Sequence, residues 1–196
     1  MPGSRDEILN AVKRNQPTLV ELPDIAIFKG DGGNLTTRFS EILTAIGGKV
    51  ITVGSIEEVC AYIKDNINNG GRNITTISSL ADVMEYVQDK NTDSHLLQDV
   101  ENAIIEAHFG VAENGAVWVT EDKLVLRALP FICQHLAVIV NANDILPTMH
   151  EAYERIGNAD YGFGTFIAGP SKTADIEQSL VLGAHGPRSM MVFLVI

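Results

Sequence analysis

The sequence predicts a single α/β domain: a three-layer, open and mostly parallel sheet with helices on both faces. In the first part of the chain, segments with helical spacing alternate with short strand-like segments, which favours parallel strands joined by crossover helices. The run Leu136–Val140, LAVIV, is apolar throughout, as is typical of a strand buried on both faces. Neither a repeat nor a low-complexity linker divides the 196 residues, so we expect residues 1–196 to form one domain.

Composition argues against several classes of function. The formal net charge is −11, from 14 basic and 25 acidic residues, which argues against binding to nucleic acid or to anionic lipid. No apolar run approaches the ~20 residues that cross a bilayer, and the polar start MPGSRDEIL is unlike a secretory signal. Cys60 and Cys133 are fewer thiols than an iron–sulfur cluster usually takes. We therefore expect a reduced, cytoplasmic protein that carries no cofactor of its own.

In the N-terminal half, capping residues and glycines mark the ends of the helices. Asn34 is a good N-cap, Ser55 with Glu58 is a capping box, and Gly47-Gly48 ends the helix that follows Asn34. The expected elements, in order, are a helix over 4–14 as an N-terminal extension, a loop over 17–33, a helix over 34–46, a strand over 49–53, a helix over 55–66 and a strand over 73–78.

In the C-terminal half, strand-forming residues alternate with turn signals. Asn143 is predicted to cap a helix. Ile176 and Leu180 lie four residues apart, so their spacing predicts a helix between Pro170 and Gly183. The expected elements are a strand near 84–87, strands over 102–109 and 111–120 or one strand with a bulge, a strand over 136–140, a helix over 143–155, a strand over 161–168, a helix after 170, and a strand over 190–196.

The block Gly110–Gly115, GVAENG, is the first candidate site. Its Asn-Gly pair is a strong turn signal, because both residues tolerate positive φ. One interpretation is a hairpin turn with a solvated Glu113. The other is a pocket wall in which Glu113 is a catalytic carboxylate. The candidate ligand-binding residues of this block are Gly110, Glu113, Asn114 and Gly115.

The start of the helix expected after Pro170 is the second candidate site. A helix N-terminus presents free N–H groups to an anion, and Lys172 adds positive charge. The alternative is ordinary capping by a Ser or Thr oxygen. Ligands in open α/β sheets bind beyond the carboxyl ends of strands, so we expect this segment and residues 113–115 to share one cleft for a small anionic ligand. The candidate residues are Gly169, Pro170, Ser171, Lys172, Thr173 and Asp175.

Arg127, His185 and Gly186 complete the candidate residues. Arg127 is predicted either to clamp a carboxylate or phosphate through its planar fork or to form a surface ion pair. His185, followed by Gly186, is a candidate general base or hydrogen-bond donor, and the alternative is a structural hydrogen bond to a carbonyl. The five histidines show no HExxH spacing, so we expect no metal site.

Several blocks of the sequence resemble one known family. They are GPSKTADIE with LVLGAHGPR near the C-terminus, GVAENGAVWV at 110–119, RALPFICQHLAVIV at 127–140, and the N-terminal SRDEILNAVKRNQP and LTTRFSEILTAIGGKV. Over nearly the whole chain these blocks resemble the LUD domain family, and within it the lactate utilisation protein C group. The resemblance implies a fold similar to that of glucosamine-phosphate isomerases, ribose-phosphate isomerases and CoA transferases. A carboxylate at the position of Glu113 is the nucleophile in CoA transferases, and this analogy of fold marks Glu113 as a catalytic candidate.

The resemblance implies an accessory role in lactate utilisation. Proteins of this group work beside iron–sulfur partner proteins, and together they support the oxidation of L-lactate to pyruvate. An alternative is a free-standing enzyme that acts on a phosphorylated, CoA-linked or folate-type small molecule in the same cleft. A third is a ligand-sensing module without catalysis. The first predicts a companion iron–sulfur polypeptide, and the second predicts turnover by the purified chain alone.

Overall fold

The computed structural model describes residues 3–21, 23–28, 30, 32–67, 70–174 and 180–196. At its centre is a six-stranded parallel sheet with the strand order β1-β12-β7-β4-β2-β3. The predicted α/β fold with a mostly parallel sheet is confirmed. The strands of this central sheet are β1 Lys49–Val53, β2 Arg72–Thr75, β3 Glu85–Tyr86, β4 Val100–Glu106, β7 His135–Asn141 and β12 Ser189–Val195.

β7, which contains the apolar run LAVIV, lies between β12 and β4. Residues Leu136–Val140 are buried, as predicted for a strand covered on both faces. Just beyond β4, the N–H of Ala107 donates to the Ile139 carbonyl at 2.9 Å. The chain therefore leaves the central sheet at its carboxyl edge immediately before His108.

A second sheet packs on one face of the central sheet through a shared apolar core. The bounds of the strands predicted over 102–109 and 111–120 are wrong, because β4 ends at Glu106 and residues 112–115 form a turn between two further strands, β5 and β6, that pair as an antiparallel hairpin. Within the turn, Oδ1 of Asn114 accepts from the N–H of Ala116 at 3.0 Å. The strand order is β8-β5-β6-β9. The bounds are β5 Phe109–Val111, β6 Ala116–Thr120, β8 Ile145–Leu146 and β9 Gly164–Ile167.

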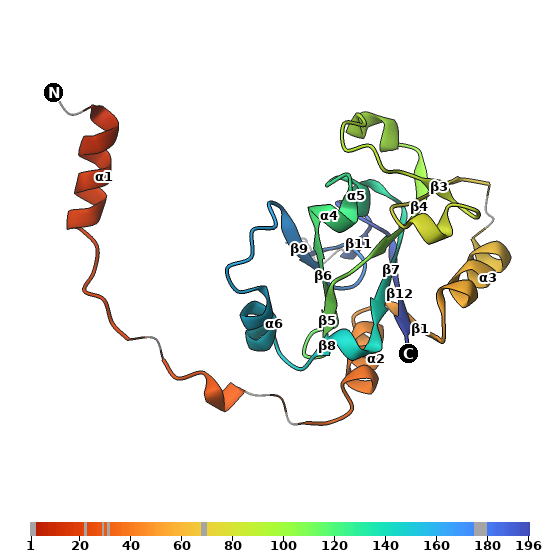
Figure 1. Cartoon of the computed structure of the whole chain (residues 1–196), viewed down its shortest axis with the longest axis horizontal. Coiled ribbons are helices and arrows are strands. Elements are labelled where there is room, and N and C mark those ends of the chain that lie inside the picture. The colour runs from red at the N-terminus through yellow and green to blue at the C-terminus, as the bar shows by residue number, and fades with distance from the viewer. Residues whose placement is uncertain (1–2, 22, 29, 31, 68–69, 175–179) are drawn as a thin grey trace.

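Helices cover both faces of the central sheet. α3 (Ile56–Asn66) packs on one face. α2 (Leu35–Ala45) covers the other face beside the second sheet, and α6 (Met149–Ile156) covers the outer side of that sheet. Figure 1 shows this succession from α3, across the central strands, to β6, β9 and α6. The remaining short elements are α4 Glu121–Leu124, α5 Leu129–Ile132, and the 3-10 turns η1 Ala26–Phe28, η2 Ser78–Leu80, η3 Ser94–Leu97 and η4 Ala142–Asp144.

The N-terminal helix α1 (Ser4–Arg14) forms over the predicted range and extends away from the rest of the chain (Figure 1). None of its residues is buried, and its apolar side chains Ile8, Leu9 and Val12 are exposed. The chain returns to the packed domain near Phe28, whose ring stacks on His150 with a centroid distance of 5.3 Å. Within the described ranges, no helix has the length and apolar character needed to cross a membrane.

Two of the predicted capping signals set helix boundaries. Asn34 caps α2, and its Oδ1 accepts from the N–H of Thr37 at 3.1 Å. Gly47, with φ +93°, follows the end of that helix. Ser55 is the N-cap residue of α3, but its side chain makes no capping bond. Glu58 accepts from the N–H of Gly54 at 3.0 Å, one residue before the N-cap, so this bond differs from that of the predicted capping box.

The helix predicted from Asn143 begins later than expected. Asn143 lies in η4, and α6 starts at Met149. Thr148 is the cap, with its Oγ1 accepting from the N–H of Glu151 at 3.3 Å. Pro147 explains the difference, because a proline disfavours helical geometry in the residue before it. The prediction is therefore wrong about the start of this helix.

The prediction of a helix after Pro170 is also wrong. Lys172–Ala174 and Leu180–Leu182 are antiparallel strands, β10 and β11, and Asp175 lies outside the described residues. A threonine and a valine, which favour extended backbone, lie opposite each other in this pair. Ser171 also forms backbone hydrogen bonds on both sides, to residues 183 and 187. The described residues therefore do not form the helix N-terminus on which the predicted anion site depended.

Candidate functional site

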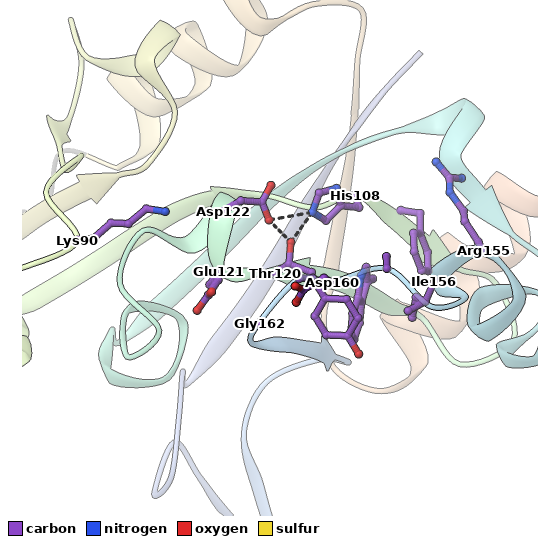
Figure 2. A pocket seen from close by; sticks show the side chains of 13 residues that line it. Lys90, His108, Thr120, Glu121, Asp122, Arg155, Ile156, Asp160 and Gly162 are labelled. Carbon is purple, nitrogen blue, oxygen red and sulfur yellow. Dashed lines mark hydrogen bonds and ion pairs between the residues drawn. The ribbon is translucent and has the colours of Figure 1, made fainter.

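A cavity of about 630 Å³ lies where the second sheet, α6 and the start of α4 meet. Its volume suits a small organic molecule. His108 follows β4 and Lys90 follows β3, so the cavity lies beyond the carboxyl ends of two central strands, where ligands of open α/β sheets bind. Figure 2 shows the side chains that line it. Its charged and hydrogen-bonding lining residues include Lys90, His108, Thr120, Glu121, Asp122, Arg155 and Asp160.

His108, Thr120 and Asp122 form a connected polar cluster on the cavity wall (Figure 2). Nε2 of His108 lies 2.5 Å from Oγ1 of Thr120 and 3.4 Å from Oδ1 of Asp122, and the Thr120 hydroxyl donates to Asp122. Thr120 is the last residue of β6 and the N-cap residue of α4, so Asp122 lies in the first turn of that helix. The N–H of His108 donates to the Trp118 carbonyl at 2.9 Å, which holds His108 beside the end of β6.

The hydrogen bonds assign the protons of this cluster. The Thr120 hydroxyl has one proton and donates it to Asp122, so Nε2 of His108 donates its proton to the Thr120 oxygen. In the neutral imidazole the lone pair then lies on Nδ1. No hydrogen bond joins Nδ1 to another residue in the described part of the chain, and the His108 side chain is 34% exposed. We infer that Nδ1 is an acceptor available to a ligand in the cavity.

Asp122 is held in its charged form. Partial burial opposes its ionisation, but the hydrogen bond from Thr120 and the nearby His108 outweigh burial, so the pKa of Asp122 is lowered from its ordinary value. A histidine oriented by a third polar group is the arrangement that proton-transfer sites use. The cluster can therefore accept a hydrogen bond or a proton at Nδ1 while Asp122 stabilises the imidazole.

Aromatic side chains form another wall of the cavity. The rings of Phe109 and Trp118 have centroids 6.4 Å apart, and Tyr161 meets Trp118 edge-on at 5.4 Å. The Arg155 guanidinium lies 5.2 Å from the Phe109 ring and forms an ion pair with Asp144 at 2.6 Å. Tyr161 is 37% exposed, whereas Trp118 is 7% exposed, so Tyr161 presents more surface to a ligand.

A second cavity of about 480 Å³ adjoins the first, and Lys90 and Glu121 line both. Lys90 is exposed, and within the described ranges no ion pair involves its ammonium group. In Figure 2 its side chain points toward Asp122. Glu121, in contrast, is paired with Arg127, with 2.5 Å between the charged groups. Lys90 is therefore a cation available to an anionic ligand at this end of the site.

A strained turn at Val125 holds Arg127 against Glu121. Val125 has φ 58° and ψ −55°, and the N–H of Leu126 donates to the Leu124 carbonyl at 2.6 Å, which together define a γ-turn of the rare, strained kind. Positive φ is unusual for a β-branched residue. The turn reverses the chain after α4, so that Nε of Arg127 also donates to Glu121 at 2.8 Å.

Arg127, which was singled out in the sequence, is paired with Glu121, a residue that lines both cavities. It lines the adjoining cavity, and its contact with Glu121 is the ion pair that was the alternative to a ligand clamp. Its guanidinium also lies 5.5 Å from the ring of Phe163.

The block Gly110–Gly115 is held mainly by packing and capping. The Glu113 carboxylate accepts from the N–H of Met149 at 2.7 Å, so it caps the start of α6. Gly115 has φ +69°, and a Cβ there would lie 3.0 Å from the backbone of Leu43. A Cβ on Gly110 would overlap Ile145. These glycines permit close approach of α2 and β8 to the hairpin.

Residues 169–173, with His185 and Gly186, lie at the opposite edge of the central sheet. His185 and Gly186 come shortly before β12, and the N–H of Ser171 donates to the Pro187 carbonyl at 2.9 Å, so both segments sit near the amino ends of the strands. The Lys172 ammonium donates to the Ile46 carbonyl, and Pro170 packs on Gly47. His185 is exposed. Gly115 and Gly169 both contact α2 or its C-terminal end, but their segments line neither of the two cavities described above.

His108, Thr120, Asp122, Lys90 and Asp160 were missed as site residues by reasoning from the sequence. The usable signal was the polar triplet Thr120–Asp122 directly after the apolar strand AVWV. Among the described residues, no three His, Cys, Asp or Glu side chains are grouped so as to hold a metal ion.

Comparison with known proteins supplies the family. The model of the LUD domain matches residues 36–195. Lactate utilization protein C of Bacillus pumilus is 26% identical over 171 residues, covering 83% of this chain and 66% of that protein. Lactate utilization protein C of Anoxybacillus flavithermus is 26% identical over 192 residues, covering 94% of this chain and 78% of that protein. In two further proteins of that name the match spans less than half of their length.

A solved structure shares the fold. A DUF162 family protein from Deinococcus radiodurans superposes with a TM-score of 0.65 at 20% sequence identity, covering 83% of this chain and 96% of that chain. The match to the LUD domain takes in every strand of the central sheet and both walls of the His108 cavity. The chain therefore belongs to the LUD domain family.

Proposed function

We propose that this protein takes part in lactate utilisation, as a cytoplasmic accessory to the oxidation of L-lactate to pyruvate by iron–sulfur partner proteins. One observation carries the proposal: the LUD domain model matches residues 36–195, and relatives named lactate utilization protein C align with as much as 98% of this chain. The role assigned to this chain is ligand binding or assembly, with no cofactor of its own.

The placement of the cysteines supports a division of labour between chains. Cys133 is buried in the core on one face of the central sheet, and Cys60 packs into the core on the other face, so both thiols are free. Burial raises the pKa of the Cys133 thiol to about 12, which keeps it protonated at neutral pH and makes it a poor metal ligand. In this proposal the iron–sulfur clusters therefore belong to the partner chains.

The cavity at His108 is the proposed ligand site. It combines an acceptor at Nδ1 of His108, an aromatic wall and the ammonium of Lys90, which forms no ion pair with the described residues, all in one concave site beyond the carboxyl ends of strands. A small organic acid can contact all three of these features at once.

A second candidate function is that of a free-standing enzyme acting on a phosphorylated, CoA-linked or folate-type molecule. The observation that favours it is size, because a cavity of about 630 Å³ is far larger than lactate. This alternative predicts turnover by the purified chain without a partner.

Growth of a deletion strain tests the proposal. Cells that lack the gene are expected to grow normally on pyruvate and poorly on L-lactate, and a plasmid copy is expected to restore growth. The tagged protein purified from lactate-grown cells is expected to bring iron–sulfur polypeptides with it. Normal growth on L-lactate, in a genome without a second copy of the gene, would remove the proposal.

A further inference from the structure

We propose that the His108 cavity binds a monocarboxylic 2-hydroxy acid whose side chain is apolar and larger than a methyl group. The hydroxyl of this ligand donates to Nδ1 of His108, its carboxylate lies against the ammonium of Lys90, and its side chain lies against Tyr161 and Ile156. The inference rests on the proposed function for the choice of 2-hydroxy acids, and goes beyond it by selecting ligands larger than lactate.

The acceptor for the hydroxyl follows from the proton arrangement of the cluster. Thr120 donates to Asp122 and receives the Nε2 proton of His108, so Nδ1 is left as an acceptor. Thr120 is 3% exposed, and its contact with Nε2 fixes the orientation of the His108 ring. An acceptor held in one orientation binds a hydroxyl donor with little further loss of side-chain freedom. A ligand that carries a keto oxygen in place of the hydroxyl meets this nitrogen lone pair with another acceptor, so the site favours the alcohol over the ketone.

The charges on the cavity wall favour one carboxylate. Glu121 is neutralised by Arg127, and Arg155 by Asp144. Lys90 is the cation left for a ligand among these lining residues. The carboxylates of Asp122 and Asp160 also line the cavity, and they repel a second anionic group. Monocarboxylates are therefore preferred to dicarboxylates such as malate.

The size and apolar walls of the cavity favour a bulky side chain. A volume of about 630 Å³ leaves most of the space empty when lactate is bound. Tyr161 is 37% exposed and stands edge-on to Trp118, and Ile156 lines the same cavity. An aromatic ligand ring that covers this surface removes apolar area from water, and lactate does not reach it.

The test is calorimetric titration of the purified full chain with L- and D-3-phenyllactate, 3-phenylpropionate, phenylpyruvate, L-lactate and L-malate. Saturable binding of at least one phenyllactate enantiomer is expected. 3-Phenylpropionate, which lacks only the hydroxyl, is expected to bind about 3- to 10-fold more weakly. L-Lactate is expected to bind at least about 10-fold more weakly, because it lacks the ring. Phenylpyruvate and L-malate should also bind more weakly than phenyllactate.

Matched variants assign the contacts. His108→Ala is expected to abolish the preference for phenyllactate over 3-phenylpropionate, whereas His95→Ala, at a side chain that is 95% exposed, keeps it. Lys90→Gln is expected to weaken the binding of both acids by about 2- to 5-fold, and Lys64→Gln, on the far face of the domain, leaves it unchanged. Lys90 is exposed, so its substitution does not put the fold at risk and the test does not depend on His108→Ala alone.

Three results would overturn the inference: equal binding of phenyllactate and 3-phenylpropionate, tighter binding of L-lactate than of phenyllactate, or no saturable binding of any hydroxy acid. Growth separates this inference from the proposed function. A deletion strain that fails on L-lactate, together with a purified chain that binds no hydroxy acid, leaves the lactate role standing and removes only the ligand assignment. Normal growth on L-lactate with selective binding of phenyllactate removes the lactate role and keeps the site.

Discussion

The imidazole Nε2 of His108 lies 2.5 Å from the hydroxyl of Thr120, although 12 positions separate the two residues in the chain. His108 lies just past the last residue of β4, and Thr120 ends β6. The β5–β6 hairpin folds back on itself and so brings the two residues together. Asp122 completes the contact from the first turn of α4.

Replacing Thr120 with valine keeps the shape of this buried side chain and removes the hydroxyl that joins His108 to Asp122. The expected loss is about 1 kcal/mol of unfolding free energy, because Asp122 is partly exposed and can turn to water. Urea denaturation measures it. Thr52→Val on the edge strand β1 is the control and should stay within about 0.5 kcal/mol of wild type. Equal stability of the two variants would contradict a structural role for the hydroxyl.

Asp122 gives the stability of the fold a defined dependence on pH. Its pKa is lowered in the folded state, so its contribution is complete above the ordinary aspartate pKa of about 4 and is lost as pH falls through the lower, folded value. The difference in stability between wild type and Asp122→Asn should therefore be largest near neutral pH and shrink below about pH 4. Denaturation at a series of pH values measures this. Asp82→Asn, at an exposed carboxylate, should show a smaller difference that changes less with pH.

Arg72 anchors the segment that carries Lys90. Its guanidinium makes a bidentate contact with Glu85 at 2.6 and 2.8 Å and reaches Asp99 at 3.0 Å. The contact with Arg72 also lowers the pKa of Glu85. Arg72→Met should cost about 1 kcal/mol and speed amide hydrogen exchange over residues 88–98. Arg5→Met in the exposed helix α1 is the control for loss of charge. Unchanged exchange in that segment would show that Arg72 does not hold it.

Val125 predicts an unusual tolerance of glycine. Its positive φ stores about 1–3 kcal/mol of strain, which glycine relieves, and this gain offsets the lost side-chain packing. Val125→Gly is therefore expected to lie within about 1 kcal/mol of wild type in unfolding free energy. Val50→Gly, at a partly buried residue of strand β1, should cost about 2 kcal/mol or more. A larger loss at Val125 than at Val50 would mean that the turn stores little strain.

The sequence correctly predicts those elements whose ends are determined by residues a few positions away in the chain. Asn34 and the glycines at 47 and 48 bound α2, and the apolar run LAVIV forms β7 because both of its faces are covered by packed layers. The segment after Pro170 could not be predicted in this way. Its helical spacing competes with contacts to distant parts of the chain, such as the bond from Lys172 to the Ile46 carbonyl.

The site was missed for the same physical reason. The walls of the cavity come from residue 90, residues 108–109, residues 118–122 and residues 155–162, which meet only when the second sheet folds onto the first. The spacing of residues along the chain therefore does not predict that these segments come together. Glu113, for which the sequence left a solvated turn and a catalytic role open, lies in the predicted turn, and its carboxylate caps α6.

Complementation of the deletion strain tests most directly whether the His108 cavity serves lactate utilisation. The growth rate on L-lactate is measured for cells that carry wild type, His108→Ala or His95→Ala. Each protein is expressed to the same level, and a thermal melting curve verifies that it is folded. We expect His95→Ala to restore growth and cells with His108→Ala to grow no faster than the deletion strain. Wild-type growth on L-lactate with His108→Ala would show that lactate utilisation does not depend on this cavity.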